Sequence, residues 1–298
     1  MDRIIRTITS DGSLMASAID STQLVYTAQQ LHTLTKTSTA ALGRLLTGAS
    51  LMGAMLKEAN ATLTLKVAGD GPLGSLLAVA NSRGYVRGYV DHPEVELPPK
   101  PNGKLDVGGA VGHIGRLAVI RDFGTGEPYS GQVELVSGEI AEDLTSYYAH
   151  SEQTPTVCAL GVLVDKKDGD ALLAGGMLIQ ALPGADNTAL SLLEQNVAEM
   201  DSVTTMLAKG LSLEEMCHLA LKGFQVEKLD ETKVGYACNC SKERFTRVLL
   251  TLSREELETL PVNKDGLVET VCQYCNRKYL FSKEEIQALV EKTRKKGK

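Results

Sequence analysis

The chain has 298 residues, of which 43% are hydrophobic and 23% are charged. This is the composition of a globular protein of about two domains, and it excludes collagen-like, mucin-like and wholly disordered chains. The formal net charge of −6 gives no overall attraction to nucleic acid or acidic lipid, and a chain with no Trp and only 4 Phe has little with which to stack on bases. We therefore expect neither a nucleic acid nor a membrane as partner.

The first part of the chain is predicted to consist mainly of strands. A Ser/Thr cluster followed by apolar residues at three-to-four spacing predicts a helix over 37–59. The other expected elements are strands at 63–67, 76–80, 85–90, 116–121, 132–136, 156–164 and 171–180, an irregular segment over 91–115 and a helix over 138–150. Because most of these strands follow one another directly, we predict an α+β domain, residues 1–185, built on mainly antiparallel sheet.

The next segment, residues 186–230, carries no strand pattern. Leu and Met recur at helical spacing from Leu190 to Leu207, and Ser212 with Glu215 forms a capping box that begins another helix. We predict a helical linker here. Its apolar stripe is either ordinary core or, if a covering domain comes away, an adaptable apolar surface.

The last part of the chain differs from the rest in charge and in cysteine content. From Glu231 onward there are 14 basic and 10 acidic residues, a net charge of +4, whereas residues 1–230 have 17 against 27, a net charge of −10. Capping boxes at Ser253/Glu256 and Ser282/Glu285 predict two helices. We therefore predict a separate C-terminal domain over 231–298, which is short enough to need a metal or a disulfide for stability.

Four of the 6 cysteines lie in this C-terminal domain, as Cys238-Asn-Cys240 and Cys272-Gln-Tyr-Cys275. Two close pairs of thiolates that the chain brings together suit the tetrahedral coordination of Zn²⁺. We predict one Zn²⁺ per chain, bound by Cys238, Cys240, Cys272 and Cys275. The N-terminal sequence has no apolar stretch of signal-peptide length, so we expect a cytoplasmic protein whose clustered thiols bind metal or act in redox chemistry.

Several functions are compatible with such a site. The metal can be a structural staple only, or it can also be an oxidant sensor, because thiolates bound to zinc remain oxidisable. A zinc ribbon that binds nucleic acid or a ribosomal partner through the basic C-terminal domain is an alternative. A thiol oxidoreductase is less consistent with the sequence, since a strand pattern rather than a helix start follows Cys275. Cys158 and Cys217 are expected to be buried as small hydrophobic residues, and no ATPase or hydrolase motif is present, so we expect no enzyme.

Three stretches of the sequence resemble a known family. They are the four-cysteine pattern, the segment Ser137-Gly-Glu-Ile-Ala-Glu-Asp-Leu-Thr-Ser-Tyr-Tyr148 with Ser151-Glu-Gln-Thr-Pro155, and Gly175-Gly-Met-Leu-Ile-Gln-Ala-Leu-Pro-Gly184. On these motifs and on its domain order, the whole chain resembles the 33 kDa heat-shock protein family of redox-regulated bacterial chaperones.

The resemblance implies an ATP-independent holdase that binds unfolding proteins under oxidative stress. In this family the reduced, zinc-bound protein is an inactive monomer. Oxidation is implied to release zinc and to form the disulfides Cys238–Cys240 and Cys272–Cys275, after which the linker melts and a dimer binds clients. The resemblance also implies that clients pass later to an ATP-driven foldase system.

Overall fold

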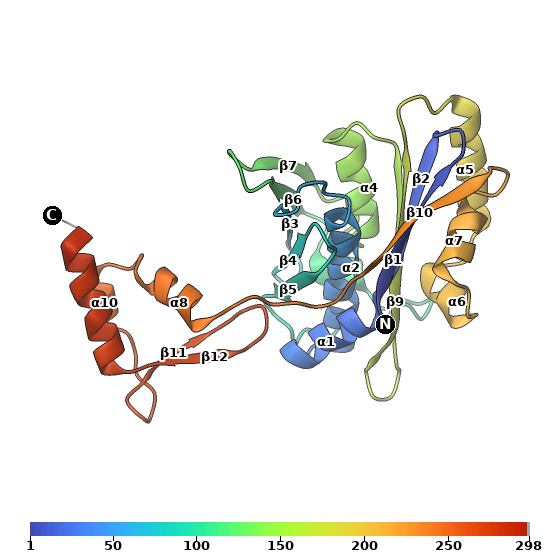
Figure 1. The fold of residues 1–298 in the computed structure, drawn as a ribbon. Helices are drawn as coiled ribbons and strands as arrows, with labels where there is room; N and C mark the ends of the chain where they lie inside the picture. Colours follow the sequence, from blue (N-terminus) through green and yellow to red (C-terminus); the bar gives the residue numbers. More distant parts are fainter. Residues whose placement is uncertain (297–298) are drawn as a thin grey trace. The chain divides into compact units, whose positions relative to one another are not determined.

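The computed structural model describes residues 1–296 and divides the chain into two compact units, Met1–Ala237 and Cys238–Lys298 (Figure 1). Residues 297 and 298 of the predicted C-terminal domain lie outside the described part. No helix within that part is long and apolar enough to cross a membrane. The α+β class with mainly antiparallel sheet is confirmed, since every paired strand has antiparallel neighbours.

The first unit contains two five-stranded sheets. One sheet has the order β10-β1-β2-β9-β8, with the bounds β1 Arg3–Thr9, β2 Leu14–Asp20, β8 Thr156–Val164, β9 Ala171–Ala181 and β10 Val226–Lys233. The other has the order β5-β4-β3-β6-β7, with the bounds β3 Thr62–Gly69, β4 Ser75–Asn81, β5 Val86–Val90, β6 Gly115–Asp122 and β7 Tyr129–Glu134.

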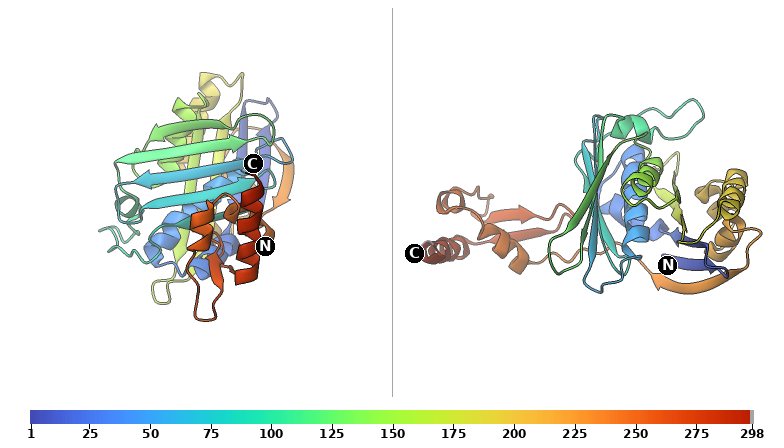
Figure 2. Two further views of the ribbon diagram at one scale, coloured as in Figure 1. Left: turned by 90° about the vertical axis from the view of Figure 1, so that its left-hand side faces the viewer. Right: turned by 90° about the horizontal axis from the view of Figure 1, so that it is seen from above.

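Helix α2, Lys36–Gly53, lies between the two sheets and packs against strands of both (Figure 2, right). Thr35 caps its N-terminus by accepting a hydrogen bond from the Ser38 N–H. A methyl group at Gly43 would lie 2.8 Å from Val25 and 2.9 Å from Val162, so the helix can sit this close only with glycine there. The aliphatic side chains of α2 and of both sheets form the main core. Helices α1 Thr22–His32, α3 Val107–Val111 and α4 Ala141–His150 complete this part of the unit.

The stretch predicted to be a helical linker contains helices between residues 187 and 220, and these pack on the face of the first sheet opposite α2. Its helices are α5 Asn187–Glu199, α6 Val203–Ala208 and α7 Leu213–Ala220. The capping box of Ser212 and Glu215 is present. Met206, Leu213 and Met216 are buried in a second core cluster against β1, β2 and β9, so in this structure the stripe of Leu and Met is core.

The two units meet between Ala237 and Cys238, seven residues beyond the boundary expected at residue 230. The reason is β10, a strand that the sequence does not predict. It pairs with β1 in antiparallel register, and two ion pairs cross the pairing: Arg3–Glu231 at 3.0 Å and Arg6–Asp230. Residues 226–237 therefore belong to the first unit.

The loop that precedes α4 is held by a buried carboxylate. Asp143 is fully buried and accepts hydrogen bonds from four backbone N–H groups, those of Val136, Ser137, Gly138 and Ile140. Ile140 has φ +73°, an unfavourable value for a β-branched residue, and these bonds help to hold it there.

An ion cluster lies next to this loop. The Glu139 carboxylate accepts from Lys100 Nζ at 2.5 Å and from the Arg44 guanidinium. Burial raises the pKa of Glu139, but these two cations outweigh it and hold the pKa below its usual value. The cluster ties α2 to the loop before α4.

The second unit is a small α+β structure with its own core. Its elements are α8 Lys242–Leu249, α9 Arg254–Glu258, β11 Val268–Val271, β12 Lys278–Phe281 and α10 Lys283–Lys296. The strands β11 and β12 form an antiparallel hairpin. Among the side chains that the structure describes in this unit, seven buried apolar ones form the core: Leu249, Leu257, Val268, Phe281, Ile286, Leu289 and Val290. The capping boxes at Ser253/Glu256 and Ser282/Glu285 are both present.

Some expected elements need correction. The segment 91–115 is not wholly irregular, because Asp106 caps the short helix α3 by accepting from the Gly109 N–H. The strand expected at 132–136 runs over Tyr129–Glu134, because its register follows its pairing with β6. The hairpin of β1 and β2 and the helix α1 were not predicted at all.

Candidate metal centre

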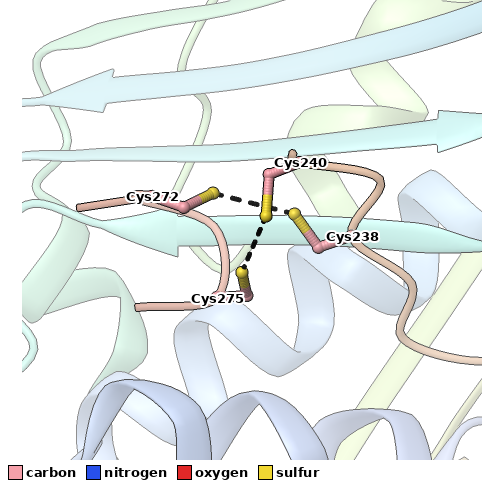
Figure 3. Close-up of side chains that lie close together, drawn as sticks. All are labelled: Cys238, Cys240, Cys272 and Cys275. Atoms are coloured by element: carbon pink, nitrogen blue, oxygen red, sulfur yellow. Dashed lines mark hydrogen bonds between the residues drawn. The ribbon is translucent and has the colours of Figure 1, made fainter. Parts of the chain in front are cut away.

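The four cysteines of the C-terminal motif come from two separate segments of the second unit. Cys238 and Cys240 lie on the chain just before α8, while Cys272 and Cys275 lie in the turn between β11 and β12. Figure 3 shows their sulfur atoms pointing toward one another. The ligands predicted from sequence spacing are therefore close together in space.

The sulfur positions match the geometry of a tetrahedral metal site. All four Sγ atoms lie within 4.8 Å of one another, with Cys238–Cys272 at 3.7 Å and Cys240–Cys275 at 3.4 Å. Four thiolates about 2.3 Å from a central Zn²⁺ would be separated by about 3.8 Å along each edge of the tetrahedron. All six cysteines are free, and the separations are far above the roughly 2.05 Å of a disulfide. The residues present thus fit a Cys₄-bound Zn²⁺.

The backbone of the second pair makes a tight turn that aims both sulfurs inward. The Cys272 carbonyl accepts from the Asn276 N–H at 2.8 Å, and the Cys272 N–H donates to the Arg277 carbonyl at 3.0 Å. Asn276 has φ +56°, in the left-handed region that asparagine tolerates better than most residues. This turn is what the C-x-x-C spacing requires.

Hydrogen bonding makes the four thiols unequal. The Tyr279 hydroxyl donates to Cys240 Sγ at 3.1 Å. Burial raises the pKa of Cys240, but hydrogen bonds from Tyr279 and from the other thiols lower it to about 7. Burial, together with hydrogen bonds that they donate to neighbouring thiols, raises the pKa of Cys238 and of Cys275. Negative charge is thus better accommodated at Cys240 than at Cys238 or Cys275, and a bound cation would favour the thiolate form of all four sulfurs.

Tyr279 is a residue that sequence reasoning missed. It lies on β12, and its ring packs 5.0 Å from that of Phe245 on α8. The only feature of the sequence that could have indicated its role is its position four residues after Cys275. An aromatic residue of the core could equally well stand there.

The other two cysteines belong to the first unit and not to the group of four. Cys217 is buried on α7, and burial raises its pKa to about 11. Cys158 lies on β8, and burial raises its pKa to about 12. Both thiols therefore stay protonated at neutral pH, in agreement with their expected role as small hydrophobic residues. The group at Cys238, Cys240, Cys272 and Cys275 is the one cluster of potential metal ligands found in the described part of the chain.

Comparison with known proteins gives a consistent result. A family model described as "Hsp33 protein" matches residues 2–282. The chain is 43% identical to the 33 kDa chaperonin of Clostridioides difficile, covering 97% of this chain and 99% of the relative, and 41% identical to that of Bacillus subtilis, covering 98% and 99%. The crystal structure of the 33 kDa chaperonin of Thermotoga maritima superimposes with a TM-score of 0.88 at 35% identity, covering 98% of this chain and 99% of that one.

Proposed function

Because the chain belongs to the Hsp33 family, whose relatives are named 33 kDa chaperonins, we propose that it is a redox-regulated, ATP-independent holdase. In this proposal the protein binds unfolding polypeptides and prevents their aggregation during oxidative stress. It acts by binding rather than by turnover. The observation that carries the proposal is the cluster of four free thiols within 4.8 Å of one another, in a small unit of its own.

In the reduced state, one Zn²⁺ would be held by Cys238, Cys240, Cys272 and Cys275. The metal would supply a tetrahedral cross-link between two distant segments of the unit. The Tyr279 hydroxyl, through its bond to Cys240, stabilises negative charge on that ligand. The seven buried apolar side chains of the unit are a small core, so the cross-link would be a large part of its stability.

Oxidation would replace this cross-link with local disulfides, Cys238–Cys240 and Cys272–Cys275. For each disulfide, two thiolates form the S–S bond and give two electrons to an oxidant such as hydrogen peroxide, which takes up two protons and is reduced to two water molecules. Cysteines separated by one or two residues stay close when the unit unfolds, whereas partners thirty or more residues apart separate, so loop entropy favours this pairing. Free thiols before oxidation suit a reducing compartment, and a cytoplasmic location belongs to the same proposal.

The linker helices supply the surface that would then bind clients. Met206, Leu213 and Met216 are buried against the first sheet, and melting of α6 and α7 would expose them. Flexible Met and Leu side chains suit partners of many sequences. The proposal includes an inactive reduced monomer, an active dimer and later transfer of clients to an ATP-driven foldase.

The test is suppression of aggregation of a chemically unfolded client by the full-length chain, before and after peroxide treatment. Zinc content and free thiols are counted in the same samples. We expect suppression only after zinc is lost and about four thiols disappear. As a control, the double variant Cys158→Ala, Cys217→Ala should respond to peroxide as the parent does.

Equal suppression in both redox states, or none in either, would refute the proposal. Binding of RNA or DNA by the reduced form, weakening steeply with salt, would instead support a zinc ribbon that binds nucleic acid. Turnover of a disulfide substrate would support a thiol oxidoreductase.

A further inference from the structure

The strand β8, Thr156–Val164, is the outer strand of the first sheet. It pairs with β9 on one side and, among residues 1–296, with no strand on the other. Its nine residues, Thr-Val-Cys-Ala-Leu-Gly-Val-Leu-Val, include no charge, no proline and a single polar side chain. None of them is fully buried, and Leu163 is 40% exposed. Natural proteins usually protect an edge strand of this kind with charges, bulges or a covering segment.

The pairing with β9 determines which main-chain groups point outward. The Ala181 N–H donates to the Pro155 carbonyl at 3.0 Å, so this pair bonds directly across the two strands. Antiparallel pairs alternate between bonded and non-bonded positions. The residues whose N–H and C=O groups face away from β9 are therefore Thr156, Cys158, Leu160 and Val162. Within residues 1–296 no hydrogen bond to these main-chain groups is found.

The other sheet edges of the first unit are protected. Strand β10 has charged side chains at five of its eight positions. Strand β5 is covered by the segment that follows β10, through bonds from the Val86 N–H to the Gly235 carbonyl at 3.0 Å and from the Ala237 N–H to the Val86 carbonyl at 2.9 Å. Strand β7 is short and contains Ser130, Gly131 and Gln132. Only β8 combines length, apolar side chains and unpaired main-chain groups within the described residues.

We propose that the free edge of β8 binds an extended, uncharged segment of a client polypeptide by strand addition. The inference rests on the proposed function and names one place where a client is held. The outward main-chain groups recognise any backbone in a β conformation, whatever its sequence. The neutral side chains of β8 favour apolar segments over charged ones, and such segments are what an unfolding protein exposes.

A second copy of this chain is a less suitable occupant. A stable protein interface takes about 20–30 residues from each partner. Edge-to-edge pairing of β8 would use only its nine residues. A peptide needs no larger contact, because it can be held reversibly and at modest affinity.

The experiment compares two labelled probe peptides that bind to the oxidised, full-length chain. One is a neutral ten-residue peptide of alternating valine and threonine. The other has the same sequence, with every second backbone nitrogen methylated along one edge. Methylation removes hydrogen-bond donors and blocks strand pairing while the side chains stay the same. We expect the methylated peptide to bind at least tenfold more weakly, and we expect backbone amides within 156–164 to gain protection from hydrogen exchange only with the unmethylated peptide.

Two pairs of variants test the same edge from the protein side. Cys158→Pro removes one outward N–H without removing a bond to β9, and Cys158→Ala is its control. Leu163→Lys places a charge beside the edge, and Leu172→Lys places one on the neighbouring strand β9, at a leucine that is 48% exposed. We expect the proline and Leu163→Lys variants to bind the unmethylated peptide about tenfold more weakly, and both controls to stay within twofold of the parent.

Each outcome decides the question. Equal affinity for the two peptides, or equal loss with Leu163→Lys and Leu172→Lys, would overturn the proposal. If Cys158→Pro and Leu163→Lys convert a dimer to a monomer and leave peptide affinity unchanged, the edge serves a second copy and the proposal is wrong. Failure of the parent protein to suppress aggregation would refute the holdase function, whereas normal suppression by both edge variants would refute only the role of β8.

Discussion

Replacement of Cys272 by serine is the most direct test of the metal centre. Cys272 is the most buried of the four cysteines, with 4% of its surface exposed. Serine is nearly the same size, so the change removes a soft ligand while it preserves packing. We expect the second unit, Cys238–Lys298, to unfold while the first unit, Met1–Ala237, stays folded.

The magnitude follows from the size of the unit. At about 0.05–0.15 kcal/mol per residue, a unit of its length has a net stability of roughly 3–9 kcal/mol. A structural zinc site contributes about 10–16 kcal/mol of apparent folding free energy. If the net stability has its largest value, about 9 kcal/mol, loss of the smallest zinc contribution, about 10 kcal/mol, still leaves the unfolded form favoured by about 1 kcal/mol. With the middle of each range, about 6 and about 13 kcal/mol, the unfolded form is favoured by about 7 kcal/mol. Seven buried apolar side chains cannot compensate for this.

The assay combines zinc analysis, far-UV circular dichroism and limited proteolysis of the full-length chain. Cys272→Ser should lose zinc and be cut rapidly after residue 237, while the fragment 1–237 persists. Cys158→Ala, a cysteine change outside the cluster, should retain zinc and resist cleavage. A zinc-free Cys272→Ser chain whose C-terminal unit still resists protease would refute the reasoning, since the core would then suffice alone.

Three further predictions concern single side chains. Tyr279→Phe removes the hydrogen bond to Cys240. The affinity of the protein for zinc, measured by titration with a competing chelator, should then fall roughly 10–100-fold. An unchanged titration would show that the hydroxyl has no role in zinc binding. Asp143→Ala leaves four backbone N–H groups without their acceptor, of which those of Gly138 and Ile140 are buried. It should destabilise the first unit by at least about 2 kcal/mol in denaturant unfolding, whereas a loss below about 1 kcal/mol would show that the loop rearranges. Glu139 has a lowered pKa in the folded state, so it stabilises the fold above the unfolded pKa and loses this effect as the pH falls through the folded value. Glu139→Gln should therefore be less stable than the parent at pH 7, by a difference that shrinks as the pH is lowered below the ordinary glutamate pKa of 4.5, and a pH-independent difference would contradict the ion-cluster argument.

The clustering of the four cysteines was predictable because its information is local. Two short spacings, C-x-C and C-x-x-C, identify four thiols, and the thirty-one residues between them are enough for the chain to return. The sequence does not show which side chain donates a hydrogen bond to which thiol. The bond from Tyr279 to Cys240 depends on how β12 lies beside the segment before α8, which is a tertiary property.

The fold was predictable where periodicity was strong and not where pairing determines structure. The alternating strands β3 and β4 and the long helix α2 follow from apolar spacing. Strand β10 has charged side chains at most positions and no apolar alternation, so nothing local marks it as a strand. It is held by pairing with β1 and by the ion pairs at Glu231 and Asp230, both with partners more than 220 residues away in sequence.

The pairing of β10 with β1 also has a consequence for the reversibility of any melting of α5, α6 and α7. Those helices lie in a stretch of about 44 residues whose two ends, after β9 and before β10, are both fixed in the same sheet. When the ends of a free chain of that length are brought together, the loss of conformational entropy raises its free energy by about 3 kcal/mol. While β10 stays paired with β1, the two ends of the stretch remain close together, so this entropy loss does not have to be repeated when the helices refold. The melted helices would therefore form a closed loop rather than a segment with a free end. The loop returns to its place by local refolding, without a search through space for its docking site.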